Sequence, residues 1–319
     1  MAVTLALAGD TMLGRSVAEV ILRAGPDAEV ADEVVAITRA ADLFLLNLEC
    51  CISERGTPWP DPRKPFFFRA PPAATSVLAR LGVDCVTLAN NHALDFGPGA
   101  LLDTFDHLRS GGIAWVGAGR DRDEARAPAV LEANGLRIGV LGCSDHPREF
   151  AAGPTSPGIA YVDPQRGLDW LPPAIARLDV DVVLITPHWG PNMIAEPLPY
   201  VRRAAGGLRA AGATLIAGHS AHVFHGVRPG VIYDMGDFLD DYAVDPELRN
   251  DLGLLFLVTF DGEEQVRLEA VPLKLDYCYT RLAEGDEAAW IRRRFRAACA
   301  ELGTEVAEEQ GRLVMVWPS

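Results

Sequence analysis

Positively charged side chains are scarce in this sequence. Of its 319 residues, 29 are Lys or Arg and 44 are Asp or Glu, which gives a formal net charge of −15. Nucleic-acid-binding proteins need a basic surface that neutralises phosphates, so this balance argues against a nucleic-acid partner. It also disfavours docking on anionic lipid. Since 49% of the residues are hydrophobic and 23% are charged, the composition is that of a folded globular protein.

Long hydrophobic runs are absent as well. The longest apolar stretch, Leu252–Phe260, has nine residues, whereas a membrane-spanning helix needs about 20. The N-terminal segment has no basic residue before Asp10, and Asp10 comes too early for the apolar core of a signal peptide. We therefore expect a cytoplasmic protein without a membrane partner.

The cysteines are few and form no Cys-x-x-Cys pair. In a cytoplasmic protein this distribution favours buried, reduced thiols over disulfides or a zinc site. The six are Cys50, Cys51, Cys85, Cys143, Cys278 and Cys299.

Short apolar runs alternate with helix-like segments, which is typical of α/β folds. Turn signals at Asn134–Gly135 and Asp261–Gly262 predict β-hairpins and argue against an all-parallel sheet. We expect two mixed sheets packed together, with helices outside. Residues 1–275 are assigned to one domain, and 276–319 to a C-terminal helix and tail packed on it. Strands are predicted at 3–8, 42–48, 84–89, 113–117, 130–132, 137–141, 181–186, 214–217, 231–233, 254–260 and 265–271, and helices near 14–23, 74–82, 98–108, 201–211 and 286–300.

One long irregular segment, residues 50–72, contains six prolines and the aromatic run Phe66 to Phe68 beside Arg69. A loop of this length inside a compact domain is usually functional or disordered. The aromatic residues favour an ordered loop that faces a substrate, and a loop that only caps the core is an equally good interpretation.

Polar side chains follow the predicted strands at their C-terminal ends, where open α/β sheets bind ligands. A lone Asp or His at such a position is usually a helix cap or a satisfied polar group. Six such positions in one chain predict a shared site instead. Asp, Glu, Asn and His together are ligands for a hard or borderline divalent cation. The sequences are Gly9-Asp10, Asn47-Leu48-Glu49, Asn90-Asn91-His92 with Asp95, His188-Trp189-Gly190, Gly218-His219-Ser220-Ala221-His222 and Gly236-Asp237-Phe238.

This order of motifs resembles that of the CapA-like proteins of capsule and poly-γ-glutamate synthesis, a branch of the calcineurin-like metallophosphoesterase superfamily. The resemblance runs from Val3 to about Leu273. It implies a four-layer α/β/β/α sandwich of two mixed sheets. It also implies that His92 acts as a proton donor, oriented by Asp95. The metal ligands that it implies are Asp10, Glu49, Asn91, His188, His219 and His222.

Two departures from the superfamily pattern bear on the metal. Met12 stands where a D-x-H motif would place a histidine, and Ser220 and Ala221 separate His219 from His222. A two-metal clamp needs a full ligand set. We therefore expect one tightly bound divalent ion, Ca²⁺, Mn²⁺ or Zn²⁺, with either His219 or His222 as its ligand.

Further residues are assigned to catalysis and substrate binding. A histidine from 219–225, with His225 as the named candidate, is expected to form a second acid–base pair with Asp237. Arg15, Arg69 and Trp189 are predicted to contact the substrate, the arginines through a carboxylate. The acid-rich stretch 234–251, apart from Asp237, is predicted to be a solvated loop.

Three functions use these residues. The first is Cα epimerisation of a peptide in a ribosomal, lasso-type pathway, because His92–Asp95 and a second His–Asp pair would supply two acid–base groups. The second is metal-dependent hydrolysis of a phosphoester or a γ-glutamyl peptide in capsule metabolism. The third is a metal-stabilised binding protein. The sequence alone favours epimerisation narrowly, with a peptide or γ-glutamyl substrate.

Overall fold

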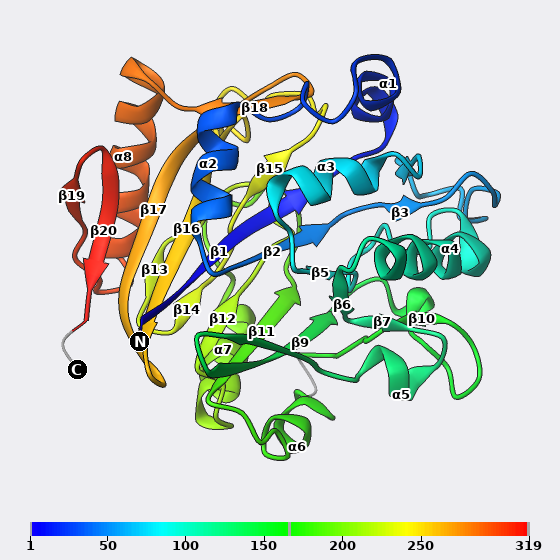
Figure 1. The fold of residues 1–319 in the computed structure, drawn as a ribbon. Coiled ribbons are helices and arrows are strands. Elements are labelled where there is room, and N and C mark those ends of the chain that lie inside the picture. Colours follow the sequence, from blue (N-terminus) through cyan, green and yellow to red (C-terminus); the bar gives the residue numbers. More distant parts are fainter. Residues whose placement is uncertain (1, 165–166, 318–319) are drawn as a thin grey trace.

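Two β-sheets pack face to face in the computed structural model, which describes residues 2–164 and 167–317 (Figure 1). The larger sheet has ten strands in the order β19-β20-β17-β16-β1-β2-β5-β6, with β15 beside β1 and β18 beside β17. Its strands are β1 (Ala2–Thr11), β2 (Leu43–Leu48), β5 (Cys85–Thr87), β6 (Ala114–Val116), β15 (Asp237–Leu239), β16 (Leu252–Asp261), β17 (Glu264–Asp276), β18 (Tyr279–Leu282), β19 (Ala307–Glu309) and β20 (Arg312–Val316).

The second sheet has six strands in the order β13-β14-β12-β11-β9-β8. They are β8 (Ala129–Ala133), β9 (Leu136–Ser144), β11 (Val182–His188), β12 (Leu215–Ala217), β13 (Val227–Arg228) and β14 (Val231–Ile232). Two small ladders pair β3 (Cys51–Ile52) with β4 (Arg69–Ala70) and β7 (Ala118–Gly119) with β10 (Gly158–Ile159).

Helices lie on both outer faces. In Figure 1, α1, α2 and α3 lie above the sheets and α6 and α7 lie below. The helices are α1 (Arg15–Ala24), α2 (Asp32–Ala40), α3 (Ala74–Leu81), α4 (Gly97–Ser110), α5 (Arg122–Ala125), α6 (Leu171–Ile175), α7 (Pro199–Ala210) and α8 (Gly285–Ala300), with a 3₁₀ turn at Arg148–Phe150.

Residue alternation along the strands explains the layers. In β1, Leu5 and Leu7 point into the core between the sheets, whereas Ala6 and Ala8 point into the core beneath the first four helices. Both faces of the strand are buried, so it reads as a continuous apolar run. In β11, Val183 and Ile185 likewise pack against α6 and α7. The predicted four-layer α/β/β/α sandwich is confirmed.

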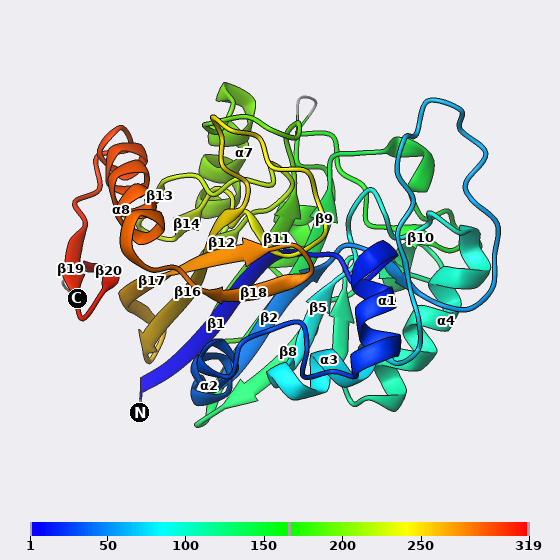
Figure 2. The same ribbon diagram turned by 90° about the horizontal axis from the view of Figure 1, so that it is seen from above.

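The C-terminal helix α8 fills the edge of the sandwich. Ile291, Phe295 and Cys299 are buried in the core between the sheets. Strand β20 then pairs with β17 in the larger sheet. Figure 2, seen from above, shows α8 and β20 beyond β17 at the left. The described part of 276–317 therefore shares the core of the main domain.

Local signals in the sequence explain several connections. Asn134 and Gly135 both have positive φ, 50° and 82°, and close the predicted hairpin between β8 and β9. The second predicted hairpin joins β16 and β17 at Gly262. All six cysteines are buried and free, as predicted. Helix α2 and most of the two- and three-residue strands were not predicted. Among the described residues, no helix is long and apolar enough to cross a membrane.

The long loop of 53–68 lies between the short strands β3 and β4. Its aromatic residues divide between surface and core, since Phe66 is 56% exposed and Phe68 only 3%. The loop is ordered by contacts such as the hydrogen bond from Trp59 N to Asp95 O, at 2.8 Å. One end of the loop thus packs beside the polar residues that follow β5.

Candidate functional site

Asp10 lies at the centre of the polar cluster, near the C-terminal end of β1. It is 1% exposed, and Asn47 Nδ2 donates to its Oδ1 at 2.7 Å. Asp10 pairs in register with Asn47 of β2 on one side and Asp237 of β15 on the other. A Cβ on the preceding Gly9 would lie 1.8 Å from Gly236 O, so only glycine permits this close approach.

Two histidines approach Asp10 from the second sheet. His188 ends β11, and its Nδ1 lies 2.8 Å from Nδ1 of His219, which follows β12. His219 Nδ1 is also 3.6 Å from Asp10 Oδ1. Its Nε2 lies 3.0 Å from the Thr186 hydroxyl, so Nδ1 is the nitrogen that faces the cluster. Two nitrogens bound at about 2.1 Å to one tetrahedral metal ion lie roughly 3.4 Å apart, so the His188 and His219 nitrogens, at 2.8 Å, are slightly closer than that spacing.

His222 and Glu49 complete the cluster. His222 Nδ1 is 2.7 Å from Asp237 Oδ1 and 3.2 Å from Asp10 Oδ2. Glu49 is fully buried and accepts a hydrogen bond from the Tyr242 hydroxyl at 3.1 Å. The sequence predicts either His219 or His222 as a metal ligand. The geometry does not require a choice, because both side chains approach Asp10.

The loop that carries these histidines has an unusual backbone. Ser220 has φ of 120° and His222 has φ of 60°, values that non-glycine residues rarely adopt. Ser220 N donates to Asp10 Oδ2 at 3.3 Å, and Ala221 N donates to Asp234 Oδ2 at 2.8 Å. Such conformations cluster at functional sites, where surrounding contacts hold them.

The protonation preferences follow from burial and neighbouring charges. Burial, reinforced by Asp10, raises the pKa of Glu49 to about 8. Burial disfavours the charged form of Asp10, but His222 and His219 outweigh it and lower the pKa of Asp10. Burial lowers the pKa of His219 to about 4 and that of His188 well below its usual range. The neutral imidazoles are the form that binds a metal ion.

The residues present fit a divalent cation. Asp10, His188 and His219 form one set of potential ligands, and Asp10, Glu49 and His222 form a second, each with its ligand atoms within 4.8 Å of one another. Twelve buried side-chain atoms have no hydrogen-bond partner among the described residues. Four of them belong to predicted metal ligands or to Asp237, and a cation would satisfy such groups. They are Glu49 Oε1, Asn91 Oδ1, His188 Nε2 and Asp237 Oδ2.

His92 and Asp95 form a pair beside this cluster. His92 Nδ1 lies 2.6 Å from Asp95 Oδ2, and Lys64 Nζ lies 2.9 Å from the other oxygen of Asp95. The His92 ring stacks on Phe68 with 3.9 Å between centroids, and Phe68 stacks in turn on Tyr242, the partner of Glu49. The loop of 53–68 therefore connects the pair with the cluster.

Two of the predicted site residues lie elsewhere. Nε2 of His225 hydrogen-bonds Ile194 O at 3.0 Å, and within the described parts of the chain His225 forms no hydrogen bond or ion pair with Asp237. Trp189 is 5% exposed, packs in the core around α7, and donates its indole N–H to Tyr233 O at 3.0 Å. Its position next to His188 in sequence directs its side chain to the other face of the strand end.

The two predicted substrate arginines lie on the long loop side of the site. Arg15 is 3.3 Å from Asp241, and its guanidinium lies over the ring of Phe68 at 5.6 Å. Arg69 lies 4.2 Å from the Phe96 ring centroid and donates to Arg55 O at 3.2 Å. Their roles in substrate binding stay predictions.

The prediction of a solvated loop at 234–251 is wrong for much of the stretch. Asp234, Asp240, Asp241 and Asp251 are at most 7% exposed. Asp234 accepts from the backbone of Ala221 and Gly236, so its carboxylate stabilises the histidine loop. Acid-rich stretches are usually solvated. Here the buried backbone N–H groups of the site require hydrogen-bond acceptors, and the Asp234 carboxylate provides them.

Asp145, His146 and Tyr200 were missed as a group. The Asp145 carboxylate contacts His146 Nδ1 and accepts from Gly190 N at 3.1 Å and from the Tyr200 hydroxyl at 3.0 Å. The His146 ring lies 5.0 Å from the His188 ring. The signal in the sequence was the position of Asp145–His146 immediately after β9, which runs parallel to β11.

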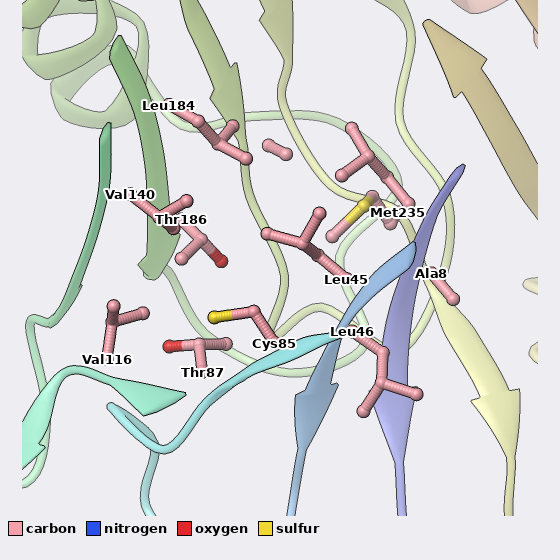
Figure 3. Close-up of a pocket in the computed structure, with 12 residues that line it drawn as sticks. Ala8, Leu45, Leu46, Cys85, Thr87, Val116, Val140, Leu184, Thr186 and Met235 are labelled. Atoms are coloured by element: carbon pink, nitrogen blue, oxygen red, sulfur yellow. The ribbon is translucent and has the colours of Figure 1, made fainter. Parts of the chain in front are cut away.

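A small cavity of about 10 Å³ lies between the sheets beneath the cluster (Figure 3). Its lining includes Thr87 and Thr186, and Thr186 is the residue that contacts His219 Nε2. The volume is close to that needed by a single water molecule. Thr186 therefore connects this cavity with the histidine cluster.

Known proteins resemble this chain over much of its length. A "Probable polyglutamine synthesis accessory protein" of Mycobacterium tuberculosis is 28% identical over 370 residues, covering 99% of this chain and 96% of its own length. The "PGA biosynthesis protein CapA" of Bacillus subtilis is 28% identical over 239 residues, covering 73% of this chain and 62% of its own.

Among solved structures, a hypothetical protein from Thermus thermophilus covers 85% of this chain and 99% of its own, with 20% identity and a TM-score of 0.51. This likeness concerns the fold alone. The model of the family described as "Bacterial capsule synthesis protein PGA_cap" matches residues 4–242, well over half of the chain. The resemblance to CapA-like proteins is thereby confirmed, and the chain belongs to the bacterial capsule synthesis protein family PGA_cap.

Proposed function

We propose that the protein is a metal-dependent hydrolase that cleaves γ-glutamyl peptide bonds in capsule or polyglutamate metabolism. The observation that carries this proposal is the buried Asp10 carboxylate, which belongs to both potential ligand sets, with the His92–Asp95 pair beside this cluster and connected to it through Phe68 and Tyr242. The substrate class comes from the names of the relatives, which concern polyglutamine and PGA synthesis. A cytoplasmic location and the absence of nucleic-acid and membrane partners stay predictions from the sequence.

The chemistry divides between a cation and the chain. A divalent cation held by Asp10 and its histidines would polarise the substrate oxygen and favour ionisation of water. His92 exchanges a proton with the reacting groups through Nε2, because Asp95 occupies Nδ1. Lys64 and Phe68 N both contact the Asp95 carboxylate and hold it in place. Burial and the stacked Phe68 ring limit the access of bulk water to His92.

Hydrolysis agrees with the comparisons better than epimerisation does. Removal and return of a proton at Cα needs two acid–base groups on opposite faces of the substrate. Of the histidines considered for a second pair with Asp237, His225 is not brought to it, whereas His222 is, at 2.7 Å. His222 also faces Asp10. The comparisons likewise support a capsule-associated function.

A phosphoester is the second candidate substrate, because of the resemblance to metallophosphoesterases. The ligand set differs from theirs at Met12, whose Sδ accepts a hydrogen bond from Gly14 N at 3.0 Å in the core and faces no ligand cluster. A phosphodiester assay belongs beside the peptide assay for this reason.

Turnover assays test the proposal directly. The purified protein, loaded with Mn²⁺ or Zn²⁺, is incubated with a γ-linked glutamate oligomer and separately with an aryl phosphodiester, and products are followed by mass spectrometry. We expect cleavage of the oligomer that stops on chelation and returns on metal addition. Cleavage of the phosphodiester alone would show that the substrate is a phosphoester and not a γ-glutamyl peptide. Deuterium incorporation at Cα in D₂O without cleavage would restore epimerisation and overturn hydrolysis.

A further inference from the structure

A cavity of about 330 Å³ walled by three arginines lies near the metal cluster. Arg122 comes from α5, Arg126 follows that helix, and Arg148 begins the 3₁₀ turn after β9. Three guanidinium groups at one cavity are unexpected in a chain with a net charge of −15. The function proposed above makes no use of them.

The cavity is shaped by small residues. Ala152 and Ala160 line it and pack with Ala125 in a separate apolar cluster, against which Trp170 rests. The Arg126 guanidinium lies 5.2 Å from the Trp170 ring centroid. A stacked guanidinium is fixed in orientation while the N–H groups at its edge stay free for a planar anion.

The arginines form no direct ion pairs among the described residues, although the charges of Asp169 and Asp123 act on Arg126. Within the described residues, none of the three guanidinium groups forms an ion pair or a side-chain hydrogen bond. Two carboxylates, Asp163 and Asp169, also line the cavity, and Asp169 acts on Arg126 only through space. Burial, and then the charge of Arg122, lower the pKa of Arg126. An anionic ligand would offset this repulsion.

The cavity continues into the cleft beside the metal cluster. Tyr161 and Asp163 line both the arginine cavity and an open cleft of about 820 Å³ that also contains His146 and Gly190. The His146 ring is 5.0 Å from that of His188. A chain-like substrate with one bond at the cluster can therefore extend along the cleft to the arginines.

We propose that Arg122, Arg126 and Arg148 form a subsite for the carboxylates of an acidic chain whose scissile bond lies at the Asp10–His188 cluster. The identity of the chain as a γ-linked glutamate oligomer rests on the proposed function. The geometry itself requires only repeated carboxylates, since each guanidinium can bind one carboxylate through two parallel hydrogen bonds. Free phosphate presents a similar set of oxygens and is the competing ligand.

The experiment measures binding without turnover. A fluorophore-labelled γ-linked hexaglutamate is titrated with the full-length protein, with metal in a His92→Ala background and after chelation otherwise, and followed by anisotropy. We expect the double variant Arg126→Gln/Arg148→Gln to raise Kd by about tenfold or more in both conditions. The control Arg120→Gln, whose side chain already pairs with Glu124, should leave Kd within about twofold. Thermal melting confirms that each variant is folded.

The outcomes separate this subsite from the proposed function. Arginine-dependent binding without hydrolysis would support the subsite and reject the γ-glutamyl hydrolase. Hydrolysis of the oligomer together with an unchanged Kd in the double variant would support the hydrolase and reject the subsite. A hexamer with its α-carboxyls amidated should bind the wild type no more tightly than the double variant. Complete displacement of the labelled hexamer by equimolar inorganic phosphate would assign a phosphate site and overturn the proposal.

Discussion

Two buried histidine–carboxylate pairs in this site have opposite protonation preferences. His92 faces Asp95 in its pair, and burial lowers the pKa of His92 to about 4 although Asp95 opposes the shift. Burial acts on His222 too, but the carboxylates of Asp237, Glu49 and Asp10 outweigh it and raise the pKa of His222 well above its usual range. The contacts are alike, at 2.6 Å and 2.7 Å. The difference arises from the number of carboxylates that face each ring.

This comparison indicates separate tasks for the two pairs. A neutral His92, held at Nδ1 by Asp95, has Nε2 free to accept a proton and return it. A positive charge on His222 offsets the carboxylates around Asp10, which is the task that a divalent cation would take over. The first pair is therefore expected to govern turnover and the second to govern metal content.

The sharpest test of this division is the variant Asp10→Asn, which removes a carboxylate that faces His222 of the second pair. Groups that only orient metal ligands already contribute about 10- to 100-fold to affinity or activity. Loss of a carboxylate shared by both ligand sets should therefore lower kcat/KM by more than about 100-fold and reduce bound metal to background. Elemental analysis and the turnover assay measure both. Asp42→Asn, at the opposite end of the same sheet, serves as the control. Unchanged metal content in Asp10→Asn would reject the ligand assignment.

The variant His92→Ala tests the other pair. We expect kcat to fall by about 100-fold, since positioned acid–base groups contribute at least that much. Metal content should stay equal to that of the wild type, because His92 belongs to neither ligand set. His107→Ala, on α4, is the matched histidine control. If His92→Ala loses its metal, the two pairs are one ligand system and the comparison fails.

Chelation extends the test to stability. A ligand present at 100 times its Kd adds about 2.7 kcal/mol to the free energy of unfolding, which corresponds to about 5 °C in Tm for a chain of this size. We expect this loss on chelation in the wild type and in His92→Ala. Asp10→Asn should show no response. An equal response in all three proteins would place the stabilising ion elsewhere.

The sequence was sufficient to predict the sandwich and most of the cluster. Apolar runs with polar ends at Asp10, Glu49, His188 and His219 are a local pattern, and parallel strands bring such ends to one edge. The helix α2 was missed because it has only nine residues and begins after Ala31, which provides no side-chain cap.

Other features depend on tertiary contacts. Lys64 and Phe68 come from a proline-rich loop, and nothing in their spacing indicates that both contact Asp95. Trp189 was placed in the site by its sequence neighbour, but alternation along the strand end turns it to the core. The burial of Asp240 and Asp241 could not be predicted, since their charge alone favours solvent.

The smallest expected effect on stability concerns Glu29. This residue tests how burial alone acts on the ionisation of a carboxylate. It is fully buried, and neither side-chain oxygen has a hydrogen-bond partner among the described residues. The nearby Arg80 instead pairs with Asp27 at 2.8 Å. Burial raises the pKa of Glu29 above its ordinary value of 4.5. A carboxyl group whose pKa is raised by folding stabilises the fold only while protonated, so its contribution declines as the pH rises above about 4.5.

Replacing this group by a neutral one should therefore stabilise the protein at neutral pH. We expect Glu29→Gln to raise the free energy of unfolding by about 1 kcal/mol at pH 7, or roughly 2 °C in Tm. The difference should vanish below about pH 4, where both side chains are neutral. Melting curves from pH 4 to pH 8 measure it, with exposed Glu33→Gln as the control. A difference that does not change with pH would show that Glu29 lacks the ionisation penalty.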